Sequence, residues 1–554
     1  MTTTSAHLDT FANDRLPAPD RQPEFLFELP TLQFPPRLNC GVALLDDAVR
    51  LRGWGARSAV LAPEGPSWRY DELLAQANRI AHVLVREMGL LPGNRVLLRS
   101  ANSPMLAACW FAVVKAGGIA VATMPLLRAG ELAAVIAKAQ VSHALCDAAL
   151  ADELDAAVAA TKDGAGRPML TALRHFHTAS PAGLEALMAH QPAQFANVDT
   201  AATDTVLIAF TSGTTGRPKG TVHNHRDLMA ACACWPPHVL KASADDRFIG
   251  SPPLAFTFGL GGLLLFPLSI GASVVLLDKQ TPAALLQAIA QHRASVLFTA
   301  PTAYRTLAAD AGAARLGAPQ GGPLRQCVSA GEVLPAATRA LWKQHTGIEL
   351  IDGIGATEML HIFISADEHD ARPGATGRVV PGYRACVLGA DGRPLPAGEV
   401  GRLAVKGPTG CRYLDDPRQA DYVQDGWNIT GDAYWQDDEG YFHFHARTDD
   451  MIVSAGYNIA APEVEEALLT HPAVAECAVV GAPDEERGQA VWAFVVLRPG
   501  HEPGPAQQRA LQDHARQAIA PYKCPRRVEF LAALPRTETG KLQRFKLKAQ
   551  AAAA

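Results

Sequence analysis

Residues 211–220 read TSGTTGRPKG and directly follow the apolar run VLIAF at 206–210. This stretch holds three glycines and four hydroxyl side chains. The N–H groups and hydroxyls of such a loop can surround phosphate oxygens, and Lys219 adds a positive charge. It is not a Walker A loop, because Pro218 stands where that pattern requires a glycine before the lysine. The stretch therefore predicts a phosphate-binding loop at the end of a strand, as opposed to a generic Gly/Ser/Thr turn.

Helical and strand patterns alternate on both sides of this loop. Residues 70–88 and 105–116 have helical patterns, and each is followed by a short apolar strand pattern. The same alternation recurs at 283–298 and at 336–351. Repeated strand–helix–strand units predict parallel sheets that are covered by helices.

The pattern of apolar and turn-forming residues changes after about residue 374. Residues 379–405 have short apolar runs broken by Pro-Gly and Asp-Gly, which favour antiparallel strands and turns. We therefore predict the α/β class, with an N-terminal tail (1–35), a large N-terminal domain (36–448) and a mobile α+β C-terminal domain (449–554). The large domain is expected to contain parallel-type sheets covered by helices and a small β-barrel-like subdomain.

Composition excludes several classes of protein. The 554 residues suggest roughly three or four domains or subdomains. A net charge of −5 makes the chain a poor candidate for binding nucleic acid, which needs a broad positive field. The ten cysteines include one close pair, Cys232 and Cys234, so free thiols in a reducing cytosol are favoured over a zinc site. The N-terminus has no secretory signal pattern, and we expect a cytoplasmic protein.

One segment has the length and polarity of a membrane span. Residues 251–277 contain no charged side chain, but they include three prolines and four glycines. These residues favour a loop, a buried helix and a strand over a span. We therefore expect no membrane partner.

Four further motifs follow in order: DGIGATE at 352–358, TGD at 430–432, RTDDMIVSAG at 447–456 and PRTETGK at 535–541. With residues 211–220, they resemble the adenylate-forming superfamily over roughly residues 40–548. This superfamily includes acyl- and aryl-CoA synthetases, peptide-synthetase adenylation domains and beetle luciferases. The resemblance implies an acid–thiol ligase that uses ATP, Mg²⁺ and coenzyme A.

The resemblance assigns roles that suit the chemistry of carboxylate activation. A carboxylate that attacks the α-phosphorus meets negative oxygens, so cations and donors must neutralise this charge. Thr357 would contact the α-phosphate, and Glu358 would bind Mg²⁺, although a solvated carboxylate at a helix start is the plain alternative. The loop residues implied to hold the β- and γ-phosphates are Thr211, Ser212, Gly213, Thr214, Thr215, Gly216 and Lys219.

Other motif residues are implied to bind the nucleoside. Asp432 and Arg447 would hold the ribose hydroxyls. On the adenine side, the resemblance points to a turn after the apolar strand at 326–329 and to the start of the DGIGATE motif. The adenine-side residues are Gly331, Glu332, Asp352 and Gly353.

The C-terminal tail is basic, with a net charge of +6 over residues 523–548. A solvated basic face is the ordinary interpretation. By resemblance, Lys541 is the cation that reaches the α-phosphate and the carboxylate during adenylation, and other basic residues meet coenzyme A phosphates. The resemblance also implies that the C-terminal domain rotates about Asp449 and brings Gly456 beside the tunnel for the thiol.

The pocket for the acid is expected between residues 253–261 and 353–364, which are mostly apolar. A flat aromatic acid fits a slot of aromatic and small side chains. His361 is the polar exception, and a pocket-lining residue and a satisfied core residue are equally open interpretations of it. The predicted lining residues are Ala255, Phe256, Phe258, Ile354, Gly355 and His361.

The string GATEMLHIFI at 355–364 resembles the benzoate–CoA ligase branch, and GYNIAAPE at 456–463 is more similar to the 2-aminobenzoate ligases. We therefore expect an aromatic acid–CoA ligase, a monomer or homodimer, with 2-aminobenzoate as the first candidate substrate. Benzoate and medium-chain fatty acids are alternative substrates. A luciferase-like oxygenase and a non-catalytic nucleotide-binding protein are alternatives of a different class. A peptide-synthetase module is disfavoured, because no carrier domain is expected before residue 554.

Overall fold

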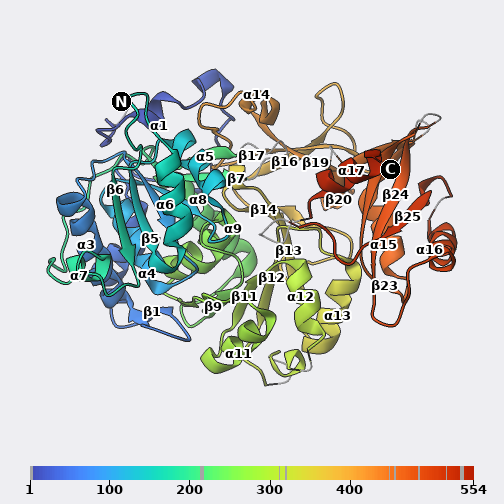
Figure 1. The fold of residues 1–554 in the computed structure, drawn as a ribbon, viewed down its shortest axis with the longest axis horizontal. Helices are drawn as coiled ribbons and strands as arrows, with labels where there is room; N and C mark the ends of the chain where they lie inside the picture. The colour runs from blue at the N-terminus through green and yellow to red at the C-terminus, as the bar shows by residue number, and fades with distance from the viewer. Residues whose placement is uncertain are drawn as a thin grey trace. The chain divides into compact units, whose positions relative to one another are not determined.

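The computed structural model describes residues 4–211, 218–310, 312–317, 321–447, 450–454, 457–484, 487–519, 521–536 and 542–553. The chain forms two compact units (Figure 1). Unit 1 comprises Met1–Ala385 and Val405–Asn428, and unit 2 comprises Cys386–Ala404 and Ile429–Ala554. These units are defined by which residues contact one another, whereas the predicted boundary at residue 449 is the point about which the C-terminal domain is expected to rotate. The boundary therefore stays a prediction.

The first sheet of unit 1 has the strand order β6-β5-β3-β4-β7-β8. Its strands are β3 (Arg95–Arg99), β4 (Ile119–Thr123), β5 (His143–Asp147), β6 (Ala172–Phe176), β7 (Thr205–Thr211) and β8 (Lys219–Asn224). All neighbours are parallel except β7 and β8, which are antiparallel.

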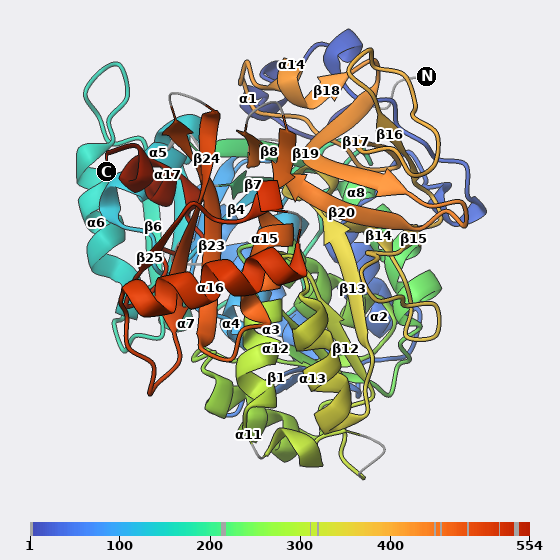
Figure 2. The ribbon, with the colours of Figure 1, turned by 90° about the vertical axis from the view of Figure 1, so that its right-hand side faces the viewer.

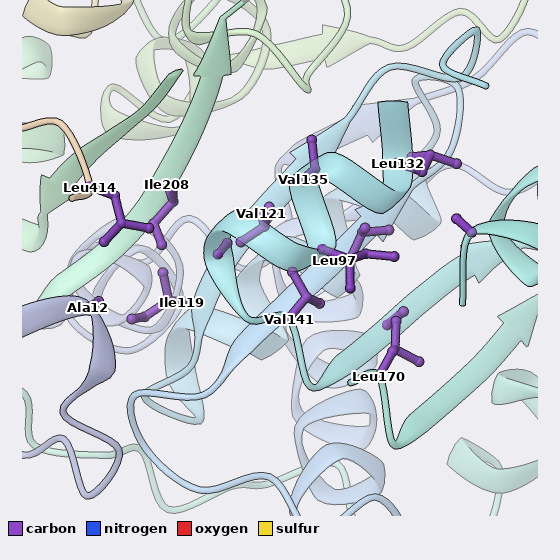
Figure 3. Packing of buried hydrophobic residues seen from close by; sticks show 14 of the residues in the cluster. Ala12, Leu97, Ile119, Val121, Leu132, Val135, Val141, Leu170, Ile208 and Leu414 are labelled. Atoms are coloured by element: carbon purple, nitrogen blue, oxygen red, sulfur yellow. The ribbon is translucent and has the colours of Figure 1, made fainter. Parts of the chain in front are cut away.

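Helices cover this sheet through a shared apolar core. The helices of this part of the chain are α1 (Phe11–Asp14), α2 (Asp47–Arg50), α3 (Tyr70–His82), α4 (Pro104–Lys115), α5 (Ala129–Ala139), α6 (Ala151–Ala160) and α7 (Leu184–Met188), and α1, α5 and α6 contribute to the core against the sheet. Leu132 and Val135 of α5 pack with Leu97 and Val121 of the sheet (Figure 3). The predicted helix at 70–88 continues beyond α3 as a wider π-helical turn, Val83–Glu87.

The second sheet of unit 1 has the order β15-β14-β13-β12-β11-β9-β10-β1-β2. Its strands are β1 (Ser58–Leu61), β2 (Trp68–Arg69), β9 (Arg247–Gly250), β10 (Ser273–Val275), β11 (Val296–Thr299), β12 (Gln326–Ser329), β13 (Leu350–Gly355), β14 (Ile362–Ser365) and β15 (Arg378–Val379). The strands from β13 to β1 are parallel, and antiparallel strands flank them at both edges.

Helices α8 (His225–Trp235), α11 (Pro282–His292), α12 (Pro301–Ala308) and α13 (Ala336–Thr346) follow strands of the two sheets. Leu285, Tyr304 and Trp342 from the last three of these helices are buried in one cluster against β11 and β12. The predicted α/β class is confirmed, because helices alternate with parallel strands as the apolar periodicity required.

The uncharged stretch 251–277 folds as predicted. A loop leads into α9 (Thr257–Leu260), a π-helical turn (Gly261–Leu265) and α10 (Phe266–Ser269), and the stretch then enters β10. Prolines and glycines divide it into short pieces. Across the described residues, no helix combines the length and apolar character that a membrane crossing requires.

The boundary between the two units passes through three strands of a five-stranded sheet, β16 (Arg384–Leu388), β17 (Gly401–Lys406) and β19 (Trp427–Gln436). The sheet also contains β18 (Val423–Gln424) and β20 (Phe442–Arg447), and the short helix α14 (Gln419–Tyr422) precedes β18. Strand β19 pairs antiparallel with both β18 and β20.

The C-terminal part of unit 2 is an α+β fold, seen most directly in Figure 2. Its strands are β21 (Met451–Ser454), β22 (Tyr457–Ala460), β23 (Val474–Asp484), β24 (Gly488–Leu497) and β25 (Arg527–Phe530), and its helices are α15 (Ala461–Leu469), α16 (Pro505–Ala518) and α17 (Arg544–Ala553). Val479 lies in a core with α15 and α16, whereas Ala478 and Val480 lie in a core with α17. This alternation follows from the two-residue period of a strand.

Candidate active site

The predicted phosphate loop joins the two strands of an antiparallel hairpin. Thr211 is the last residue of β7 and is paired with Lys219, the first residue of β8. Among the described residues, the buried Thr211 hydroxyl has no hydrogen-bond partner. Ser212, Gly213, Thr214, Thr215 and Gly216 lie outside the described residues, so their phosphate-binding roles stay predictions.

Lys219, Glu358 and a tyrosine that the sequence did not indicate meet beside this hairpin. The Lys219 Nζ donates to Tyr413 Oη at 2.7 Å and lies 3.6 Å from Glu358 Oε1. The Tyr413 hydroxyl in turn donates to Glu358 Oε1. Burial and the negative Glu358 raise the pKa of Tyr413, so its hydroxyl keeps its proton. We call Lys219, Tyr413 and Glu358 the phosphate-side triad.

A second set of buried polar groups holds the neighbouring residue Thr357. The His223 Nε2 donates to Thr357 O at 2.8 Å, and the His223 Nδ1 lies 3.8 Å from Asp227 Oδ2. Arg412 donates to Asp227 at 2.7 Å. Burial opposes ionisation of Asp227, but Arg412 and His223 lower its pKa to about 2. The carbonyl of Thr357 is therefore held by His223, which lies beside the buried Arg412–Asp227 ion pair.

Arg412 and Tyr413 are placed by backbone pairing with β8. Val222 N donates to Arg412 O, and Leu414 N donates to Gly220 O, both at 2.8 Å. Leu414 lies beside Ile208 of β7 in the apolar core (Figure 3). Tyr413 is 55 residues from Glu358 in the sequence, so no local pattern could associate them.

The adenine-side residues come from two adjacent parallel strands. Ser329 at the end of β12 is paired with Asp352 in β13, which brings the Gly331–Glu332 turn near Asp352 and Gly353. Gly331 has a φ of +92°, a value that favours glycine. The Glu332 carboxylate accepts from Thr302 Oγ1 at 2.5 Å. Burial raises the pKa of Asp352 to about 7, an effect that Arg339 offsets in part.

Asp432 and Arg447 face each other in unit 2. They are paired residues of β19 and β20, and Arg447 Nη1 donates to Asp432 Oδ1 at 3.0 Å. Gly431 has a φ of +77°, and a Cβ at this position would lie 3.2 Å from Arg447 Nη2. The structure therefore places the two predicted ribose-binding residues together.

Phe258 and His361, two of the residues predicted to line the acid pocket, lie in a cluster of aromatic rings. The His361 ring centroid lies 5.6 Å from those of Trp235 and Phe258 and 4.5 Å from that of Phe266. Phe298 lies 5.6 Å from Phe258 and extends the same wall. We call these five residues the aromatic enclosure. Trp235, Phe266 and Phe298 were missed because they come from α8, α10 and β11, which only the fold brings together.

His361 is buried, but neither ring nitrogen makes a hydrogen bond to a described residue. Burial lowers the pKa of His361 to about 3, and the Phe258 backbone offsets this only in part. The ring is therefore neutral at physiological pH. The role of His361 as a pocket-lining residue stays a prediction.

Two glycines allow α9 and its continuation to approach this enclosure. A Cβ on Gly261 would lie 2.5 Å from His361 Cδ2, and one on Gly262 would lie 2.4 Å from Phe298 Cδ1. Atoms this close overlap, so larger residues would displace the rings. Glycine at 261 and 262 thus sets how closely the helical segment meets His361 and Phe298.

The other predicted lining residues lie in two places. Ala255 and Phe256 are half-buried in the loop that leads into α9. Ile354 and Gly355 are paired with Ile364 and Ile362 across β13 and β14. Their contact with an acid stays a prediction.

Asn102 is a further buried residue that the sequence did not indicate. Its Nδ2 donates to Pro252 O at 3.0 Å, and its Oδ1 accepts from Leu254 N at 2.8 Å. One side chain therefore fixes the backbone on both sides of Pro253. This clamp holds the start of the loop that carries Ala255 and Phe256.

Asp449, Gly456 and Lys541 lie outside the described residues. Their roles as hinge, tunnel residue and catalytic cation stay predictions. The ten cysteines all lie in the described residues and form no disulfide there.

Comparison with known proteins identifies the family. The AMP-binding enzyme family matches residues 48–412, and its C-terminal domain matches residues 463–541. This chain belongs to that family. The benzoate–CoA ligase of Thauera aromatica is 35% identical to this AMP-binding enzyme over 529 residues, which cover 94% of this chain and 97% of that protein. The predicted resemblance is therefore confirmed, and the protein is an acid–thiol ligase of the benzoate–CoA ligase branch.

Two solved structures share the fold of this AMP-binding enzyme. The anthranilate CoA ligase AuaEII, in complex with anthranoyl-AMP, has a TM-score of 0.85 and 32% identity, covering 95% of this chain and 99% of that chain. A benzoate CoA ligase from Burkholderia xenovorans LB400 has a TM-score of 0.83 and 30% identity, covering 92% of this chain and 100% of that chain.

The described residues are compatible with a Mg²⁺ ion that arrives with ATP. Nowhere among them do three or more His, Cys, Asp or Glu side chains form a cluster that can hold a metal by itself. Mg²⁺ commonly uses one or two carboxylates together with substrate phosphates and water. The buried carboxylate of Glu358, next to the phosphate hairpin, fits such a shared site.

Proposed function

We propose that this enzyme activates a benzoate-type acid, 2-aminobenzoate first, as an acyl-adenylate and then forms the coenzyme A thioester. A carboxylate oxygen attacks the α-phosphorus of ATP, the bond from the α-phosphorus to the bridging oxygen breaks, and pyrophosphate leaves. The thiol sulfur then attacks the acyl carbon, AMP leaves, and the thiol proton is released. The observation that carries the proposal is the aromatic enclosure. Its central residue, His361, is separated from Glu358 in the sequence by only Met359 and Leu360.

The phosphate side of this reaction requires charge compensation. We assign Lys219 to the β- and γ-phosphates and Glu358 to Mg²⁺, which would neutralise phosphate oxygens when bound. Thr357 then contacts the α-phosphate, with its backbone held by His223. Donors fixed in advance stabilise developing charge without reorganising during the reaction.

The acid side favours a flat ring with one polar substituent. The aromatic enclosure offers apolar faces, and the neutral imidazole of His361 offers one acceptor and one donor nitrogen. The ortho-amino group of 2-aminobenzoate supplies a donor that benzoate lacks. The relatives act on both kinds of acid by name, so benzoate is the alternative substrate.

A panel of acids tests this proposal. Purified protein is incubated with ATP, Mg²⁺, coenzyme A and 2-aminobenzoate, benzoate, para-substituted benzoates or hexanoate, and thioesters are identified by mass. We expect 2-aminobenzoate and benzoate to react and bulky para-substituted acids to fail. A higher kcat/KM for hexanoate than for every benzoate would refute the aromatic assignment. Light emission without thioester would favour the oxygenase alternative.

Two half-reactions also need two arrangements of the C-terminal domain. We propose that Lys541 assists adenylation. Rotation of the C-terminal domain about Asp449 then withdraws Lys541 and brings Gly456 beside the tunnel for the thiol. Lys541→Ala should abolish adenylate formation yet still convert supplied aryl-adenylate and coenzyme A to thioester. Gly456→Leu should do the reverse, and Asp449→Pro should retain at most one half-reaction. Loss of both half-reactions in Lys541→Ala and Gly456→Leu, together with lower thermal stability, would contradict the rotation.

A further inference from the structure

We propose that Tyr413 is a positioning residue that keeps Lys219 and Glu358 apart and correctly aimed for Mg²⁺–ATP. The inference rests on the proposed function, since it concerns the same nucleotide site. Tyr413 itself need not touch the nucleotide. It acts through the two charged residues that its hydroxyl joins.

The geometry of the hydroxyl carries this inference. Tyr413 Oη accepts from Lys219 Nζ at 2.7 Å and donates to Glu358, so both its donor and its acceptor capacity are used. The ammonium and the carboxylate are 3.6 Å apart, longer than the 2.7–2.9 Å typical of a direct charge-assisted hydrogen bond. The hydroxyl therefore bridges the two groups where a direct hydrogen bond between them would otherwise form.

A direct Lys219–Glu358 pair would oppose nucleotide binding. Glu358 is buried, and Lys219 is only partly exposed, so solvent would weaken their attraction little. Each group would then have to leave the other before Lys219 could meet phosphate and Glu358 could meet Mg²⁺. With the hydroxyl in place, each charged group has a hydrogen-bond partner and neither makes a direct hydrogen bond to the other.

Tyr413 is held firmly enough to perform this role. Its backbone N donates to Gln419 Oε1 at 2.9 Å, and its residue forms a bridge with Thr221 of β8. The ring is fully buried and meets Tyr422 edge-on at 5.8 Å. The Lys219 Nζ lies 4.7 Å from the Tyr413 ring centroid, a favourable cation–π distance. Only the hydroxyl needs to be removed to test the proposal, because the ring can stay.

The test variant is Tyr413→Phe, and the matched control is Tyr70→Phe. Tyr70 is also a buried tyrosine of unit 1 that donates one hydrogen bond, to Ala272 O at 2.7 Å. Calorimetry measures ATP binding without any acid, once with Mg²⁺ and once with EDTA. We expect Tyr413→Phe to weaken Mg²⁺–ATP binding about tenfold and metal-free ATP binding much less, whereas Tyr70→Phe should leave the ratio unchanged. Steady-state kinetics should show a raised KM for ATP with the KM for the acid unaltered.

A double variant decides whether the effect passes through Glu358. In a Glu358→Gln background the carboxylate charge is gone, so adding Tyr413→Phe should change Mg²⁺–ATP binding less than twofold. Equal effects in both backgrounds, or a Tyr413→Phe protein that binds like Tyr70→Phe or does not fold, would overturn the proposal. Because these binding measurements contain no acid, failure of the proposed function would appear separately, as wild-type protein that binds Mg²⁺–ATP but makes no aryl thioester.

Discussion

The phosphate-side triad and the aromatic enclosure, both in unit 1, come closest in the sequence at Glu358 and His361 but have opposite character. Each charged group of the triad already has a protein partner. In the aromatic enclosure, the two nitrogens of His361 make no hydrogen bond to any residue in the described part of the chain. A site whose polar groups are paired keeps its shape before the ligand arrives. A site with an unpaired buried polar group is stabilised when a ligand supplies the partner.

One backbone turn separates the two regions. Leu360 has a φ of +67°, an uncommon value for a buried leucine, and Met359 O accepts from Thr409 Oγ1 at 2.8 Å. Such a conformation costs about 1–3 kcal/mol and persists where the surroundings impose it. The turn directs Glu358 to the hairpin and His361 to the aromatic enclosure.

The largest expected effect is on the charged side. Glu358→Gln removes the charge proposed to hold Mg²⁺, and we expect acid-dependent pyrophosphate release at saturating ATP to fall about 10²–10³-fold. Glu349→Gln is the matched control, because Glu349 is paired with Arg339 and Lys343 elsewhere in the unit. An unchanged rate in Glu358→Gln would remove this residue from the site.

A substitution in the aromatic enclosure should change the selectivity between acid substrates. His361→Leu keeps an apolar side chain of comparable reach but removes both nitrogens. We expect kcat/KM for 2-aminobenzoate to fall about 10–100-fold relative to that for benzoate, since a lost hydrogen bond to a substrate group lowers discrimination strongly. Benzoate is the internal control. Equal losses for both acids would mean that His361 shapes the pocket but does not recognise the amino group.

Close packing of the aromatic enclosure predicts a steric effect. Gly261→Ala would place a methyl group 2.5 Å from His361, and we expect destabilisation by about 1–3 kcal/mol together with a higher KM for the acid. Gly130→Ala is the control, because it lies in helix α5 and its Cβ would meet no atom within 4 Å. Thermal unfolding compares the two. Similar melting temperatures for the two variants would show that the helical segment shifts to accept the methyl group without loss of stability.

The last prediction concerns the pH dependence of stability. Burial raises the pKa of Asp352 to about 7, above the usual value near 4, so the folded protein disfavours the ionised form. The stability contribution of Asp352 is therefore fully present below about pH 4 and is lost as pH rises through about 7, by at most about 1.4 kcal/mol per pH unit. Asp352→Asn should remove this dependence, so its melting temperature should gain on wild type as pH rises. Parallel pH profiles for the two proteins would contradict the raised pKa of Asp352.

Local pattern was enough to predict the layers of the fold but not the partners within the site. The apolar periods at 70–88, 105–116 and 283–298 reflect helices and strands whose faces are buried, so they could be found in the sequence. Motif order placed Lys219, Thr357 and Glu358 in one site. Tyr413, Asn102 and Trp235 could not be found, because their importance arises from contacts between distant segments. Motif resemblance also could not show that the nitrogens of His361 make no hydrogen bond within the described part of the chain.

The N-terminal segment around Phe25 contacts residues that the ribosome synthesises much later. Leu26 N donates to Gly407 O at 2.9 Å, and the Phe25 ring lies 4.1 Å from the Arg412 guanidinium. Glu24 meets Lys406, which is 382 residues later in the chain. At ribosomal speeds of about 5–20 residues per second, these partners are synthesised roughly 20–80 s apart. Tyr413 is likewise made 55 residues after Glu358. The nascent chain therefore cannot complete the phosphate-side triad until about three quarters of its residues have been synthesised.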